Sequence, residues 1–335
     1  MNSPIDAALA ARVGAAATRP GPSVPLDEAA DAVAALRTAS RRAVAYVADV
    51  TGLIDAADRA ASVPVLVVNR SGFVRANAQM VDEMARGALD LEMSRADRVA
   101  TSVEVGLALA FLSSRVLGQF DPFAARLMLV APNVVRFERD LNVPQADFRL
   151  WVGLHEMTHA VQFAAAPWLS EHLSGLLRQL LSVESESAGL VDAARLIRAV
   201  ARSVRGDAGA NIVADVLSPP ARVVMDRVTA VMSLLEGHAD VVMDAVGSEV
   251  IPSLGTIRAR FDARRQGRGA MDKLVRRVAG LDAKRSQYVE GAAFVRGVLD
   301  LAGHDGLAAA FASESNLPTF AEISDPAAWV ARVLS

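Results

Sequence analysis

The run His155-Glu156-Met157-Thr158-His159 contains the residues best suited to chemistry in this chain. On a helix, side chains four residues apart lie on one face, so the two imidazoles can bind a single ion. Glu156 is rotated by about 100° from His155, which places its carboxylate beside that ion and within reach of water bound there. This is the H-E-x-x-H arrangement of zinc peptidases, and it predicts Zn²⁺ as cofactor, two histidine ligands and Glu156 as the catalytic base.

A catalytic zinc site needs a third protein ligand, and the best candidate is Glu236. It lies at the edge of the apolar stripe of a periodic helix predicted over 221–246. A carboxylate in such a place is costly unless it is paired or bound to a cation. Asp240, one turn later on the same side, could accept the free N–H of a ligand histidine and fix its tautomer.

Three other residues stay open as the third ligand. His238 is about 200° around the helix from Glu236, so these two cannot easily share one ion, and His238 fits better as a core residue or as a neighbour of a ligand. Glu184 and Glu186 have a spacing closer to that of thermolysin-like enzymes, but they also fit a solvated polar break in a helix.

Tyr288 is a candidate for the catalytic machinery. It is one of only two tyrosines and lies within LDAKRSQYVEGAAF, a stretch with several basic and polar residues. Zinc peptidases often add a Tyr, His or Arg that stabilises the developing oxyanion. Tyrosine is also common at the edge of a core, and that interpretation stays open. His172 and His304 fit ordinary surface or capping positions.

The composition limits the class of protein. Of 335 residues, 52% are hydrophobic and the net charge is −3, which allows a sizeable core and does not suit nucleic-acid binding. Cysteine is absent, so any metal must be bound by His, Asp or Glu. We find no signal peptide and no apolar stretch near 18 residues, so we expect a cytoplasmic protein without a membrane partner.

The hydrophobic pattern predicts a mainly α-helical protein with a little β-structure. Residues 1–25, small and then Pro/Gly-punctuated, are expected to form a loose N-terminal segment. Residues 26–335 are expected to form a single domain. Its N-terminal lobe would span about 26–140, and a lobe with the zinc site and C-terminal helices would span about 141–335.

Individual elements are predicted from periodicity and from turn residues. Strands are expected at 64–70, ending in a Ser-Gly turn, and at 125–135, just before the motif helix. The second could be an edge strand that pairs with an extended peptide, or an ordinary packing strand. Helices are expected over 26–60, 73–118, from about 145 to 165, over 169–206 with a polar break at 182–189, over 221–246, over 256–312 around a basic loop at 263–269, and in a short Pro-started segment near the C-terminus.

The blocks HEMTHAVQF, EGHADVVMDAVG, VLGQFDPF and KRSQYVEGAAF resemble those of an actinobacterial zincin-like metallopeptidase family. Some members of that family are associated with the biosynthesis of a deazaflavin coenzyme. The resemblance spans nearly the whole chain from about residue 27. It implies a zincin-like fold with a small sheet beside the motif helix, zinc on His155 and His159, Glu156 as base, and EGHAD as part of the site. The long interval from His159 to Glu236 departs from thermolysin-like spacing, so the third ligand stays open.

These residues together predict a zinc-dependent hydrolase, with metallopeptidase as the first hypothesis and a peptide or small amide as substrate. Zinc would activate water and Glu156 would act as general base. One alternative is a zinc-binding scaffold protein of the same fold without catalysis, which a closed four-ligand site would favour. The other is a hydrolase of a non-peptide amide or ester.

Overall fold

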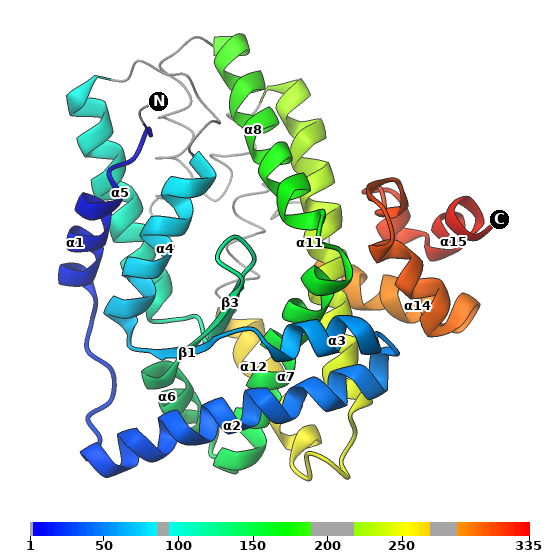
Figure 1. Cartoon of the computed structure of the whole chain (residues 1–335), viewed down its shortest axis with the longest axis horizontal. Helices are drawn as coiled ribbons and strands as arrows, with labels where there is room; N and C mark the ends of the chain where they lie inside the picture. The colour runs from blue at the N-terminus through cyan, green and yellow to red at the C-terminus, as the bar shows by residue number, and fades with distance from the viewer. Residues whose placement is uncertain (1–2, 86–93, 189–217, 269–286) are drawn as a thin grey trace.

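The computed structural model describes residues 3–85, 94–188, 218–268 and 287–335 (Figure 1). These ranges are mainly helical and contain one small sheet, which confirms the predicted fold class. The elements are α1 (Ala7–Ala17), α2 (Leu26–Thr51), α3 (Ile54–Ala61), β1 (Val65–Val68), α4 (Arg70–Ala85), α5 (Arg95–Ser113), β2 (Gly118–Asp121), β3 (Arg126–Val130), α6 (Ala131–Leu141), α7 (Gln145–Ala165), α8 (Leu169–Ala188), α11 (Pro219–Ala245), α12 (Leu254–Arg268), α14 (Gln287–Ala308) and α15 (Pro326–Leu334), with short 3-10 helices η2 (Ala309–Phe311), η3 (Glu314–Asn316) and η4 (Glu322–Ser324).

The sheet has the strand order β1-β3-β2, with β1 parallel and β2 antiparallel to β3. The strand predicted at 125–135 is therefore the central strand, and the edge-strand interpretation of it is wrong. Its second half is also not a strand, because Pro132 stands in the first turn of α6, where its fixed φ favours a helix start. The prediction missed edge strand β2: the helix expected over 73–118 reaches only its first residue, and no element was expected over 119–121.

Helix α7 carries the H-E-x-x-H motif and lies at the centre of the main core. It begins directly after Pro144 and ends before Pro167, as predicted. Helix α2 packs along one side of α7, and β2 and α11 contact it elsewhere. The Phe120 ring of β2 packs against the Phe163 ring of α7, with centroids 5.5 Å apart. The small sheet thus lies beside the motif helix.

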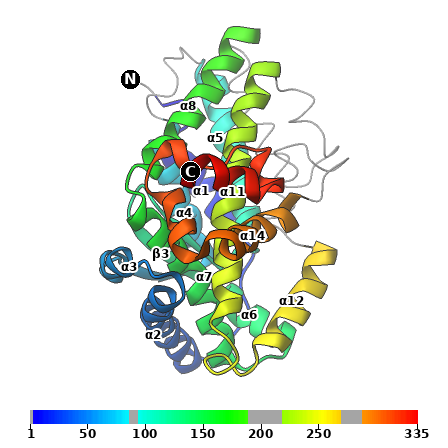
Figure 2. The same cartoon turned by 90° about the vertical axis from the view of Figure 1, so that its right-hand side faces the viewer.

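Helix α11 brings the second part of the site to α7. Its upper part runs beside α8, and the helix continues downward past the end of α8 (Figure 2). Helix α14 crosses α11 where Gly237 faces Gly291, and a Cβ atom on Gly237 would lie 2.3 Å from the Gly291 carbonyl oxygen. Only glycine permits this approach, and it fixes α11 immediately next to Glu236.

Residues 3–17 differ from the loose segment expected there, because they include the packed helix α1. Helix α1 packs with α4 and α5 on one side of the sheet (Figure 1). Ile5 and Ala10 are buried, and the Asp6 side chain caps the helix by accepting the Leu9 N–H at 2.9 Å. Alanine is the strongest helix former, so an Ala-rich stretch can be an ordered helix. The division of the chain into one domain stays a prediction.

Three predicted breaks lie inside helices. The Ser-Gly pair at 71–72 is in the first turns of α4, the polar residues up to 188 continue α8, and the basic residues up to 268 continue α12. Polar and charged side chains on an exposed helix face do not stop a helix. The predictions for 189–217 and 269–286 lie outside the described residues. None of the described helices has an apolar stretch long enough to cross a membrane.

Candidate metal centre

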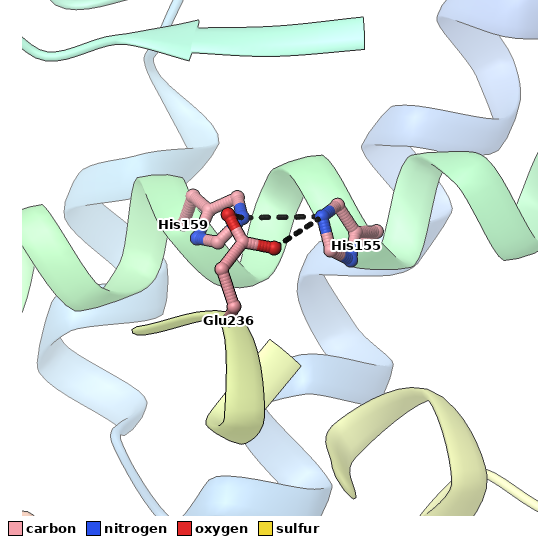
Figure 3. Close-up of side chains that lie close together, drawn as sticks. All are labelled: His155, His159 and Glu236. Atoms are coloured by element: carbon pink, nitrogen blue, oxygen red, sulfur yellow. Dashed lines mark hydrogen bonds and ion pairs between the residues drawn. The ribbon is translucent and has the colours of Figure 1, made fainter. Parts of the chain in front are cut away.

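The side chains of His155 and His159 on α7 and of Glu236 on α11 converge on one point (Figure 3). The two Nε2 atoms are 3.2 Å apart. The Glu236 carboxylate oxygens lie 3.6 Å from His155 Nε2 and 3.7 Å from His159 Nε2. Tetrahedral zinc with bonds of about 2.0–2.2 Å holds its ligand atoms about 3.3–3.6 Å apart. The three separations, 3.2, 3.6 and 3.7 Å, are each within about 0.1 Å of that range.

The charges around this point also suit a divalent cation. Burial raises the pKa of Glu156 well above its usual range, and the negative charge of Glu236 raises it further, while a main-chain hydrogen bond from Phe120 opposes the shift. Among the described residues, no Arg or Lys side chain forms an ion pair with Glu236. Two carboxylates thus lie near each other without a fixed cation, and a bound metal ion would neutralise them.

The ligand side chains are only partly covered. His155 is 26% exposed, His159 12% and Glu236 29%. Part of each ligand side chain is therefore in contact with solvent. An open position is what distinguishes a catalytic zinc site from a closed structural one.

Glu156 is buried between α7 and the edge strand β2, and the contact depends on a glycine that our sequence reading passed over. A Cβ atom on Gly118 would lie 2.6 Å from Glu156 Cγ and 2.8 Å from its Oε1. No other residue type allows the carboxylate to approach this closely. A glycine within a strand often marks such an approach, and this was the available signal.

A second group missed from the sequence lies behind His159. The side chain of Gln162, fully buried, has its Oε1 2.9 Å from His159 Nδ1 and its Nε2 3.1 Å from His238 Nδ1. His238 is also buried, and burial, with the nearby His159 and His304, lowers its pKa to about 3. The available signal was a polar residue on the buried face of α7, one turn after the second histidine.

The other predicted site residues have different surroundings. The Asp240 carboxylate lies 3.4 Å from an Arg258 guanidinium nitrogen, and Met243 Sδ lies 3.3 Å from His155 Nδ1. That Asp240 fixes a histidine tautomer stays a prediction. Tyr288 is in the first turn of α14, close in sequence to the Gly291 crossing beside Glu236, but its side chain is outside the described part.

The remaining ligand candidates do not join the group. His238 Nδ1 faces Gln162 instead, on the far side of that amide from His159. Glu184 and Glu186 belong to α8, and their side chains are outside the described part. In the described residues, the group of ligand atoms that all lie within 4.8 Å of one another is formed by His155, His159 and Glu236.

Two histidines one helical turn apart, a carboxylate from a later helix and a second carboxylate beside them form a group that could hold a metal ion, and zincins use the same residue types. The chain belongs to the zincin-like metallopeptidase family, whose model matches residues 5–330. It is also similar to a protein from Chloroflexus aurantiacus, described as a hydrolase candidate with a novel fold. The TM-score is 0.71 and the sequence identity 28%, over 98% of each chain. No curated protein matches the chain.

These comparisons confirm the predicted family and support a hydrolase. The family also implies a bound metal, usually zinc. An actinobacterial origin and a link to deazaflavin coenzyme biosynthesis stay predictions.

Proposed function

We propose that this protein is a zinc-dependent hydrolase, and specifically a metallopeptidase. The observation that carries the proposal is the convergence of His155 Nε2, His159 Nε2 and the Glu236 carboxylate at separations that suit one zinc ion. Membership of the zincin-like metallopeptidase family supports it independently.

His155, His159 and Glu236 would hold the zinc ion, which would supply a Lewis acid able to polarise a carbonyl group and to lower the pKa of water toward 7. Glu156 acts as the general base: its carboxylate takes a proton from the attacking water and passes it to the leaving nitrogen. Glu156 is buried against Gly118 on β2, which holds its carboxylate beside the three ligand side chains. Tyr288 remains our candidate for stabilising the oxyanion.

The position of β2 favours a peptide as substrate. The Leu117 carbonyl oxygen accepts a hydrogen bond from the Val130 N–H. In an antiparallel pair, residues along a strand alternate between bonding to the neighbouring strand and pointing away from it. The main-chain groups of Gly118 and Phe120 therefore point away from β3, and one of them, the Phe120 N–H, already donates to the Glu156 carboxylate. An extended peptide could pair with this edge and place one of its carbonyl groups near the metal centre.

The decisive experiment uses Glu156→Gln, which keeps the shape of the side chain but removes the base. We expect zinc binding to be retained and peptide hydrolysis to fall by about 10²–10⁴-fold. Cleavage of a mixed peptide library by the zinc-loaded protein, followed by mass spectrometry, gives the activity. The matched control is Glu171→Gln, because Glu171 is an exposed residue of α8. Undiminished turnover by the Glu156 variant would contradict the mechanism.

Two alternatives make different predictions in the same experiment. A zinc-binding scaffold would bind zinc and cleave nothing, but the partly exposed ligands and a buried base beside them favour catalysis. A hydrolase of non-peptide amides or esters would ignore the peptide library and cleave small amide or ester substrates, with the same dependence on Glu156.

A further inference from the structure

Behind the metal centre, a chain of hydrogen bonds links the two helices that hold the ligands. From α7, His159 contacts Gln162, at 2.9 Å between Nδ1 and Oε1. The other end of the Gln162 amide reaches α11, where Nε2 donates to the Leu235 carbonyl oxygen at 2.9 Å and faces His238 Nδ1 at 3.1 Å. Gln162 has no exposed surface, so bulk water does not compete for the hydrogen bonds of its amide.

The Leu235 carbonyl determines which way the amide points. A main-chain carbonyl oxygen can only accept a hydrogen bond, so the NH₂ end of Gln162 must face it. The amide oxygen is then directed at His159 Nδ1. Because that oxygen also can only accept, the imidazole proton must lie on Nδ1.

The consequence for His159 concerns its other ring nitrogen. With the proton on Nδ1, the Nε2 atom carries a free lone pair, and Nε2 is the atom that faces His155 and Glu236. On the far side, the second amide proton of Gln162 points at His238 Nδ1, which must therefore accept it. His238 then carries its proton on Nε2, so it completes the chain of hydrogen bonds and stays neutral.

We propose that Gln162 is a positioning residue that holds His159 in the tautomer able to bind metal and ties it to the main chain of α11 directly before Glu236. The sequence reading had assigned such a role to Asp240. This inference rests on the proposed zinc site for its function. Outer partners of histidine ligands commonly fix the ring orientation in this way, and their loss typically weakens metal binding by about 10–100-fold.

The test begins with the tautomer of His159 in the zinc-free wild-type protein, measured by NMR of protein labelled with ¹⁵N at its histidine rings. We expect the proton on Nδ1. Gln162→Met keeps a similar side-chain volume but cannot accept the hydrogen bond from His159 Nδ1. We therefore expect the imidazole proton of His159 to move toward Nε2 in this variant. Gln162→Glu keeps an acceptor facing His159, and we expect it to retain the Nδ1 proton.

Zinc affinity, measured by competition with a chromophoric chelator, is the second readout. We expect Gln162→Met to raise the dissociation constant by about 10–100-fold and Gln162→Glu to recover most of that loss. The matched control is Gln145→Met, which changes an exposed residue of the same helix and should leave the affinity unchanged. If Gln162 acted through packing alone, zinc binding would be weakened equally in Gln162→Met and Gln162→Glu.

Two results would overturn the assignment of Gln162: a wild-type His159 proton on Nε2, or an unchanged zinc dissociation constant in Gln162→Met. Failure of the zinc site itself would look different. In that case the wild-type protein would not bind zinc tightly, while the tautomer measurement would still test the hydrogen-bond chain.

Discussion

The metal centre and the contact between α8 and η3 combine the same residue types in different ways. At the metal centre, Glu236 lies 3.6 and 3.7 Å from two histidines. At the other contact, Glu314 lies 3.0 Å from His172 Nδ1 and 3.7 Å from an Arg227 guanidinium nitrogen. The Glu314 side chain is 60% exposed, whereas that of Glu236 is 29% exposed.

The comparison shows what distinguishes a metal site from an ion pair. Glu314 already has a guanidinium and water to balance its charge. Among the described residues, the ion-pair partners of Glu236 are the imidazoles of His155 and His159, and no guanidinium balances its charge. A histidine next to a glutamate is therefore not informative by itself. Three ligand atoms that face one another without a fixed cation are informative.

The largest expected difference between the two regions is in zinc binding. His159→Ala or Glu236→Ala removes a ligand, and we expect the zinc dissociation constant to rise by more than the 10–100-fold typical of an outer partner. His172→Ala and Glu314→Ala should retain wild-type affinity. Zinc content after dialysis against a weak chelator, measured by mass spectrometry, checks both pairs.

Metal removal offers an independent check of the same prediction. A ligand present at 1,000 times its dissociation constant stabilises the folded state by about 4 kcal/mol. Urea unfolding of the wild-type and Glu314→Ala proteins should therefore shift when zinc is added, and that of Glu236→Ala should not. Equal shifts in all three proteins would place the zinc site elsewhere.

The local half of the metal centre could be predicted from the sequence, and the reason is helical periodicity. His155, Glu156 and His159 are fixed relative to one another by one helix, so their spacing alone predicts their geometry. Glu236 could be ranked above the other candidates for the third ligand, because a carboxylate at the edge of an apolar stripe is costly unless it is paired or bound to a cation. Its contact with α7 depends on the packing of α14 on α11, which no local pattern reveals.

What the sequence did not reveal depends on contacts between distant segments. Strand β2 has only four residues and no clear alternation, so its sheet partner decides its conformation. The approach of Gly118 to Glu156 and the link from Gln162 to Leu235 likewise join residues from different elements. In helix α1 the high helix propensity of alanine outweighs the small side chains that suggest a loose segment.

A smaller effect, on the free energy of unfolding, is expected from changing Glu322, which forms an ion pair with Arg332 near the C-terminus. Burial tends to raise the pKa of its carboxyl group, but hydrogen bonds from Arg332 and Thr319 outweigh that effect and lower it. The folded state therefore has the lower pKa. The resulting stability is fully present above the unfolded value near 4.3 and is lost as the pH falls through the folded value.

Glu322→Gln should accordingly cost roughly 1–2 kcal/mol at pH 7, since hydrogen bonds to a charged group are involved. The difference from wild type should shrink as the pH falls below about 5. Urea unfolding at pH 7 and pH 3.5 measures both values, with zinc affinity at pH 7 expected to be unchanged. A deficit that is the same at both pH values would show that the loss comes from packing and not from the charge.

The smallest effect is expected from Glu314→Gln, the counterpart of Glu236 in the α8–η3 contact. Its side chain is mostly exposed, and exposed ion pairs typically contribute about 0–1 kcal/mol. We expect a loss below about 1 kcal/mol in urea unfolding, with zinc affinity and hydrolysis as in the wild type. Glu236→Gln makes the same replacement, of one carboxylate oxygen by an amide NH₂, yet should abolish tight zinc binding. If the two glutamine variants bound zinc equally well, the convergence of ligand atoms around Glu236 would not be the feature that makes this site a metal centre.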